Sequence, residues 1–346
     1  MKKRTLFILS LAILLIITGG IGSTIFYQRL EAERKASAVS KKFKYDGTKE
    51  LELVFKNGAN VDISTSEDDY IRMNKNGINF GKQPKQSATW EIKTQGDKTI
   101  VTIDNNIKDQ QIEHRFFSFG SITEDSIYLR LPDKYQSIKV SGQHVNVNIN
   151  RLSTQTLSLE SKRGYISVDE SNVKHLEAET KYGDITINGV KAEEAIKLTS
   201  LAGNVSAQES RSNTLDITSK NGDIFSANTK GNITMASDNG YISVNHTIGT
   251  ADIKNKNNDI FYHTDKINKK VSLETIHGDI NIETDKPSLE KNEVQFKTTN
   301  GVIAIFNKNL SSETEYKQTK GDTSISATSK NGNINVDELE DDDDHY

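Results

Sequence analysis

The sequences "TSKNGDI" at residues 218–224 and "TSKNGNI" at residues 328–334 are nearly the same heptapeptide. They agree at all but one position, although they lie in distant parts of the chain. Such agreement indicates a repeat, and related units do occur before, between and beside the two copies. Aligned on the glycine, the repeated position is Gly164, Gly183, Gly203, Gly222, Gly240, Asn258, Gly278, Gly301 and Gly332.

The spacing of these positions is nearly constant. Successive members are 19, 20, 19, 18, 18, 20, 23 and 31 residues apart, which is typical of stacked repeats. Apolar residues alternate within each unit, as in half-buried strands: Leu157 and Leu159 precede Gly164, and Ile166 and Val168 follow it. The alternation changes parity at the glycine, which predicts a corner or a tight reversal there.

The recurrence of glycine or asparagine at one place predicts a turn with a positive φ, which glycine adopts freely and asparagine at small cost. We therefore interpret the aligned residues as structural turn residues. An asparagine comes directly before several of them, at Asn221, Asn239, Asn257, Asn300 and Asn331.

Two architectures fit this pattern. Asn-Gly between alternating runs is a strong hairpin signal, so each unit could be an antiparallel hairpin. A solenoid, however, requires rungs of equal circumference, and the central units keep a spacing of 18 to 20 residues. The sequence therefore favours an all-β fold with a single-stack β-solenoid (β-helix) of ~19-residue repeats.

The repeats occupy residues 156–336. Residues 45–155 have the same alternation with looser spacing, and we expect an irregular β-rich cap that begins the same stack and covers its open edge. The acidic residues 337–346, "DELEDDDDHY", are expected to be a disordered tail.

The N-terminus carries a membrane signal. After the basic residues 1–4, residues 5–26 form an uncharged apolar run, and about 20 helical residues cross a hydrocarbon core. We expect an uncleaved single-pass anchor there, a short cytoplasmic head at residues 1–4 and a stalk at residues 27–44. The basic head places the body outside the cell membrane, although the stalk is itself rich in lysine and arginine.

Composition excludes several functions. The net charge of −4 provides no basic field for nucleic acid. Without any cysteine, the chain has no disulfide and no Cys-ligated zinc. The sequence also lacks the paired motifs of hydrolases and metalloproteases. We therefore expect no enzyme and no cofactor, with a polysaccharide-active enzyme on the same scaffold as the alternative.

These residues together suggest a family. The apolar anchor, the strand "IYLRLPDKYQSIKV" with Leu131 and Pro132, and the repeated "l-x-l-x-T/S-x-x-G-D/x-I-x-V" units resemble the LiaG-like adhesins. The resemblance spans roughly residues 45–336. It implies an extracytoplasmic envelope protein of Gram-positive bacteria, often connected with envelope stress, and it transfers no catalytic residue.

Two groups of residues are candidate sites. Stacked rungs would place Asp259 and Asp279 side by side, with oxygen ligands that suit Ca²⁺, unless the aspartates only stabilise the turn. In the latter case Lys181, Lys220 and Lys256 would pair across the turn with Asp184, Asp223 and Asp259. In the cap, the aromatic residues Phe116, Phe117 and Phe119 are either a ligand surface or core.

The expected function is binding. The sequence predicts a membrane-anchored, adhesin-like or envelope-stress accessory module whose partner is a cell-envelope polymer, a lipid surface or a membrane protein. The remaining alternative is a structural or regulatory partner of a neighbouring membrane protein.

Overall fold

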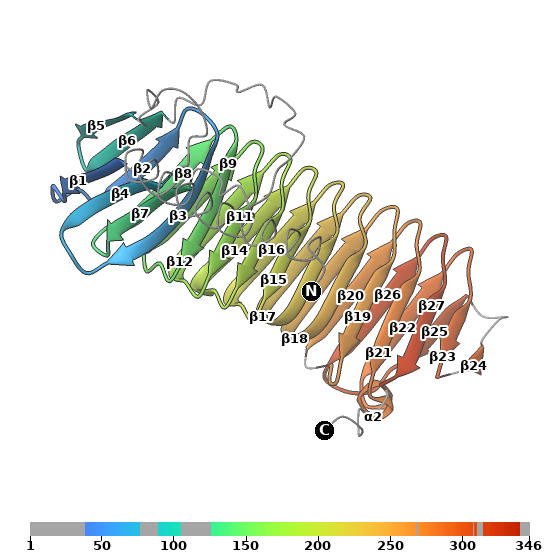
Figure 1. The fold of residues 1–346 in the computed structure, drawn as a ribbon. Helices are drawn as coiled ribbons and strands as arrows, with labels where there is room; N and C mark the ends of the chain where they lie inside the picture. Colours follow the sequence, from blue (N-terminus) through green and yellow to red (C-terminus); the bar gives the residue numbers. More distant parts are fainter. Residues whose placement is uncertain are drawn as a thin grey trace, which may run out of the picture.

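The computed structural model describes residues 39–76, 89–104, 126–267, 269–306, 308–309 and 314–339. In this part of the chain the strands form one long stack, and the one helix is the short α2 (Lys286–Glu290) (Figure 1). The predicted membrane anchor at residues 5–26 lies outside it. Among the described residues, no helix is both long enough and apolar enough to span a membrane.

Each regular rung contributes one strand to each of two faces. Strands of the first face are β8 (Ser137–Gly142), β10 (Thr156–Ser161), β12 (Asn172–Thr180), β14 (Lys191–Ser200), β16 (Arg211–Ser219) and β20 (Lys270–Thr275). Strands of the second face are β9 (Val145–Asn150), β11 (Ile166–Asp169), β13 (Ile185–Asn188), β15 (Val205–Gln208), β19 (Ile260–Thr264) and β21 (Ile280–Thr284).

Two longer strands run from one face to the other. The first residues of β17 (Ile224–Ser237) pair with β15 on the second face, and its later residues pair with β16 on the first. β18 (Ile242–Asn255) follows β17 in parallel along its length. The two faces are thus parts of one continuous coil.

The pairing between neighbouring rungs is parallel. β10 pairs in parallel with β8 on one side and with β12 on the other. The apolar columns therefore fall in register, as Leu157 with Leu176 and Leu176 with Ile196, and all three side chains are buried. This pairing confirms the all-β solenoid and excludes antiparallel hairpins for these units.

The N-terminal end of the stack does not follow the order of the chain. β2 (Glu50–Phe55) lies between β6 (Lys98–Asp104) and β8, and β3 (Ala59–Ser66) lies between β7 (Ser126–Pro132) and β9. The rung made by β6 and β7 is therefore the outermost parallel rung, although it comes later in sequence. The predicted cap does begin the same stack.

At the C-terminal end, too, the order of the rungs differs from the order of the chain. β26 (Ser324–Ser329) and β27 (Ile334–Glu338) come last in sequence but pair directly with β20 and β21. On their other side they pair with β22 (Glu293–Thr298) and β23 (Ile303–Ile305). The long final spacing between Gly301 and Gly332 thus separates two rungs whose order in the stack is reversed.

Antiparallel strands cover the outer rungs at both ends. β4 (Tyr70–Asn76) pairs with β7, β1 (Val39–Lys44) pairs with β4, and β5 (Thr89–Gln95) pairs with β6. At the other end the short β24 (Lys308–Asn309) and β25 (Glu315–Gln318) pair with β23 and β22. Such strands protect open edges from pairing with other chains.

These limits correct two predicted boundaries. β1 starts at Val39, so the last residues of the predicted stalk belong to the stack, and the cap begins before residue 45. β27 continues to Glu338, so the first residues of the predicted tail are a paired strand.

Candidate functional site

The predicted turn residues gather at one corner between the two faces, which we call the glycine corner. There each glycine touches the backbone of the rung before it. A Cβ atom built on Gly183 would lie 2.1 Å from the carbonyl oxygen of Gly164, and one on Gly222 would lie 2.1 Å from that of Gly203. The same close approach joins Gly332 to Gly278 and Gly301 to Gly332.

The reason for glycine at this corner differs from the predicted one. The backbones of Gly183, Gly203 and Gly222 do not adopt the left-handed conformation. The requirement at these three glycines is close stacking, because a Cβ atom there would collide with the carbonyl group of the preceding rung; the aligned Asn258 is the exception. A left-handed backbone occurs instead at the opposite corner, which we call the left-handed corner. Its residues with a positive φ are Arg151, Glu170, Gly189, Glu209, Asn228 and His246.

A column of buried hydroxyl groups supports the glycine corner, and the role of these residues was not predicted. Ser219 Oγ donates to the carbonyl of Gly203 at 2.8 Å and accepts the N–H of Gly222 at 3.0 Å. The other hydroxyl members also lie three residues before an aligned turn position and donate to the preceding rung: Thr180, Ser200, Ser237, Thr275, Thr298 and Ser329. At the equivalent position Asn255 donates through its side-chain amide. The repeat consensus contains this position, but its contact became visible only in the stack.

The aspartates after the glycines link one rung to the next. Asp259 Oδ1 accepts the N–H of Asp279 at 2.8 Å, and Asp279 Oδ1 accepts the N–H of Asn333 at 2.7 Å. These bonds hold adjacent turns of the stack together. Ca²⁺ binding by Asp259 and Asp279 stays a prediction; the group of three metal-capable side chains that gathers within the described ranges includes neither.

Two further expectations concern neighbouring residues. The predicted cross-turn pair of Lys256 with Asp259 is wrong: Lys256 Nζ lies 2.6 Å from Asp238 on the preceding rung. Phe116, Phe117 and Phe119 lie outside the described residues, so the choice between ligand surface and core stays open.

A shallow groove crosses several rungs on the side away from the glycine corner. Its volume is about 610 Å³, and its lining comes from the connections before β8 and β10 and from the first residues of β12, β14 and β16. Residues 133–136, 153–155, 172–174, 191–193 and Arg211 form this lining. It is continuous because equivalent parts of successive rungs lie side by side.

Three exposed cations form a row that begins in this groove, which we call the cation row: Lys191 and Arg211 line the groove, and Lys230 follows on the next rung. Lys191 is paired in register with Arg211, and Arg211 with Lys230, so neighbours are one strand spacing apart, ~4.8 Å. Within the described part of the chain, no carboxylate lies within ion-pair distance of any of the three. Like charges directly opposite on neighbouring strands destabilise a sheet, so an anion would be favoured there.

Other charges in the groove are already engaged. Lys174 Nζ lies 3.9 Å from Glu193, and Lys134 forms an ion pair with Asp69. The hydrogen bond and charge of Asp69 raise the pKa of Lys134. Burial raises the pKa of Tyr135, which stays neutral. The cation row therefore holds the positive charge of this region that no carboxylate pairs within the described residues, and its signal in the sequence was a basic residue recurring at the repeat spacing.

Comparison with known proteins agrees with this architecture. The profile of the Toastrack DUF4097 family matches residues 48–245 and again residues 226–337. No curated protein matches the chain.

The chain also matches solved structures that are distant in sequence. A "putative adhesin" from Parabacteroides merdae is 10% identical, with a TM-score of 0.43, 88% of this chain and 96% of that chain covered. A "putative lipid binding protein" from Parabacteroides distasonis is 10% identical, with a TM-score of 0.40 and coverage of 88% and 97%. A "putative adhesin" from Bacteroides fragilis is 12% identical, with a TM-score of 0.34 and coverage of 87% and 97%. These likenesses are too distant to transfer a ligand.

Proposed function

Since this chain belongs to the Toastrack DUF4097 family, whose name states no activity, we propose a function from its geometry: a non-catalytic module that binds a polyanionic polymer of the cell envelope. The observation that supports this proposal is the cation row of Lys191, Arg211 and Lys230. The three side chains are exposed and in register on successive rungs.

The shape of the site favours a polymer over a small ligand. The groove is shallow and continues across rungs, so it offers several equivalent contacts and no enclosed cavity. An exposed charge contact contributes only about 0–1 kcal/mol. Contacts repeated along one chain act together because each holds the next at a high effective concentration.

The chemistry of the cation row also limits the class of polymer that it would bind. A guanidinium group binds phosphate or carboxylate oxygens in pairs, and lysine adds a point charge. We commit to a polymer that carries phosphodiester groups in its backbone. The acids of the groove are Asp133 and Glu193, and Glu193 already contacts Lys174, so the groove supplies no second free carboxylate for glycoside cleavage.

The cellular setting is part of the same proposal. We place the rod on the outer side of the membrane, anchored by residues 5–26, in the role of the LiaG-like envelope-stress accessory proteins. The anchor would keep the groove close to the wall, which raises the local concentration of its polymer.

Co-sedimentation tests the proposal. Residues 39–346, which include every described strand, are mixed with isolated Gram-positive cell walls, with walls stripped of phosphodiester polymers by hydrofluoric acid, and with vesicles containing anionic lipid. We expect pelleting with intact walls and a loss of at least tenfold with stripped walls. Pelleting with vesicles alone would indicate a lipid surface and contradict the polymer.

A pair of matched variants locates the contact. Replacing Lys191, Arg211 and Lys230 by Glu should abolish pelleting with walls. Replacing Lys162, Lys181 and Lys220 by Glu changes the net charge equally, but on the glycine corner, and should leave most of the pelleting. Equal losses in both variants would show that total charge, and not this row, governs binding.

A further inference from the structure

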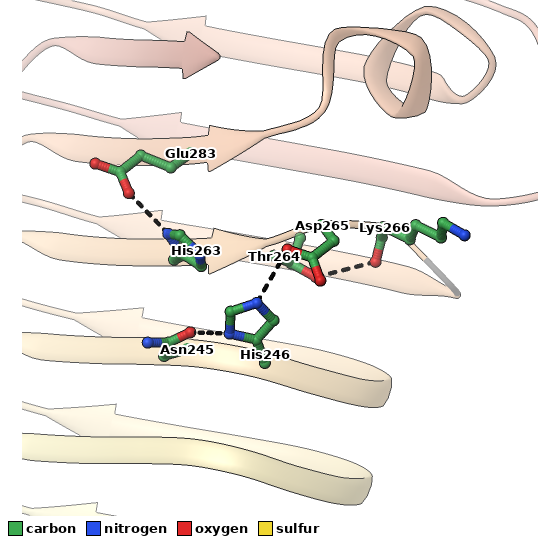
Figure 2. Close-up of polar contacts among 7 residues, drawn as sticks. All are labelled: Asn245, His246, His263, Thr264, Asp265, Lys266 and Glu283. Carbon is green, nitrogen blue, oxygen red and sulfur yellow. Dashed lines mark hydrogen bonds and ion pairs between the residues drawn. The ribbon is translucent and has the colours of Figure 1, made fainter. Parts of the chain in front are cut away.

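The geometry points to a binding site for a divalent transition-metal ion, above all Zn²⁺. His246, His263 and Asp265 form this site. The three lie on two neighbouring rungs at the left-handed corner, far from the glycine corner. Figure 2 shows the two imidazoles and the carboxylate of Asp265 turned toward one another. Each offers one ligand atom, and these atoms lie within 4.8 Å of one another.

The fold brings these residues together. His246 lies in β18 at the point where the strand turns the corner, with a φ of 50°. His263 lies in β19, paired in register with Asn245 beside His246. Asp265 follows β19 directly. The ring centroids of the two histidines are 4.8 Å apart, so the cluster depends on the stacking of rungs and is absent from any single repeat.

Hydrogen bonds orient the imidazole of His263 for metal binding. Its Nδ1 lies 2.8 Å from Glu283 Oε2 on the next rung, where β19 and β21 pair His263 with Glu283. An ionised carboxylate only accepts hydrogen bonds, so Nδ1 carries a proton, and in the neutral imidazole that binds a metal Nε2 then has the free lone pair. A carboxylate on the second nitrogen is the usual support of a metal-binding histidine.

His246 is held in the same manner. Its Nδ1 is hydrogen-bonded to Asn245 Oδ1, and its Nε2 faces Asp265 Oδ1 at 3.0 Å. In a tetrahedral zinc site with ligand bonds near 2.0–2.1 Å, neighbouring ligand atoms lie ~3.3 Å apart. The His246–Asp265 separation already fits this edge, and the half-exposed His263 needs only a small side-chain movement to complete the set.

The donor set determines the class of ion. Two imidazole nitrogens and one carboxylate oxygen suit Zn²⁺ and its neighbours Ni²⁺ and Cu²⁺, whereas Ca²⁺ and Mg²⁺ require oxygen ligands. Three protein ligands leave at least one coordination position open. Since the cluster is accessible, that position would hold water or an oxygen atom of an external ligand.

Metal binding by the full chain tests this site. The chelator-treated protein is titrated with ZnCl₂ in a calorimeter, and with CoCl₂ while the visible absorption is recorded. We expect one Zn²⁺ per chain and the intense Co²⁺ bands of a site with nitrogen ligands. A failure to bind Zn²⁺ at micromolar concentration would overturn the proposal and leave an ion-paired histidine cluster.

Variants separate this site from adventitious binding. Replacing His246 and His263 together by Asn should remove the bound Zn²⁺, whereas His277→Asn, on the glycine corner, should not. Glu283→Gln leaves all three ligands in place and should weaken binding by about tenfold or more, because the support of His263 is lost. Unchanged stoichiometry and affinity in the double variant would overturn the site, and circular dichroism shows whether each variant is folded.

Discussion

The glycine corner and the left-handed corner make opposite demands on their residues. At the glycine corner the backbone conformation is ordinary, but the preceding carbonyl leaves no room for a Cβ atom. At the left-handed corner the backbone carries the strain while the side chains point outward, so arginine, glutamate and asparagine occupy it. A side-chain clash with backbone cannot relax by a rotamer change, whereas a left-handed residue costs only about 1–2 kcal/mol.

Gly222→Ala and Gly189→Asn test this contrast. The first adds a Cβ atom 2.1 Å from Gly203 O, and we expect a loss of about 3 kcal/mol in the free energy of unfolding. The second keeps a φ of +65° at a position where a Cβ atom would make only ordinary contacts, 3.7 Å from Glu170, and we expect a loss below about 1 kcal/mol. Urea denaturation measures both, and similar losses would contradict the two roles.

The hydroxyl column makes a second prediction at this scale. Ser219→Ala removes a donor and an acceptor from a buried position, and unsatisfied buried groups cost about 1–3 kcal/mol. Thr186→Ala on the exposed surface of β13 is the control, with an expected change within about 0.5 kcal/mol. Equal stability of the two variants would show that water replaces the hydroxyl group.

Asp46 gives the stability of the N-terminal end a pH dependence. Burial opposes ionisation of this carboxyl, but hydrogen bonds from Thr48, Thr94 and Thr99 outweigh it and hold its pKa below the ordinary value. A lowered folded-state pKa stabilises the protein above the unfolded pKa, near 3.9, and this contribution is lost as the pH falls through the folded value.

We therefore expect Asp46→Asn to lower the urea midpoint at pH 6. The difference from the unsubstituted protein should shrink progressively below about pH 3.9. A difference that stays constant from pH 6 to the acid range would show that the carboxylate charge is not involved.

At the scale of elements, the inserted rung of β26 and β27 joins β20 and β21 to β22 and β23. Each inserted strand pairs on both sides. The strands after it in the stack come earlier in sequence. Their place therefore depends on the C-terminus of the chain, and the last rung cannot be completed until this segment is available.

A chain that ends at residue 318 lacks both inserted strands. We expect lower thermal stability and concentration-dependent oligomers, because the edges of β20 and β21 become open for pairing. Light scattering after gel filtration and a thermal melt measure these effects, with a chain ending at residue 339 as the control. A stable monomer would show that β22 and β23 can stack directly on β20 and β21.

At the scale of the molecule, the stack is nearly one-dimensional, so each rung is stabilised mainly by its two neighbours. The end rungs have one regular neighbour and depend on the antiparallel strands that cover them. The cation row and the histidine cluster both lie on regular rungs of the interior, where the backbone is held from both sides.

Trp90 allows the stability of the N-terminal end to be compared with that of the whole stack. It is the one tryptophan of the sequence, and it lies in β5 at the N-terminal end. During urea denaturation we expect its fluorescence to change at a lower concentration than the circular dichroism of the whole stack. Coincident transitions would show that the rod unfolds as a single cooperative unit.

The repeat, its strands and its solenoid class could all be predicted from the order of residues alone. Period and alternation are local properties: a fixed circumference and a buried face appear in the spacing of residues such as Leu157, Leu159 and Gly164. The close stacking of Gly222, the buried bonds of Ser219 and the reversed order of the final rungs required the tertiary structure. So did the cation row and the cluster of His246, His263 and Asp265. These features arise between rungs, where residues about 20 apart or more become neighbours only through the register of the pairing, and a single sequence carries that register only implicitly.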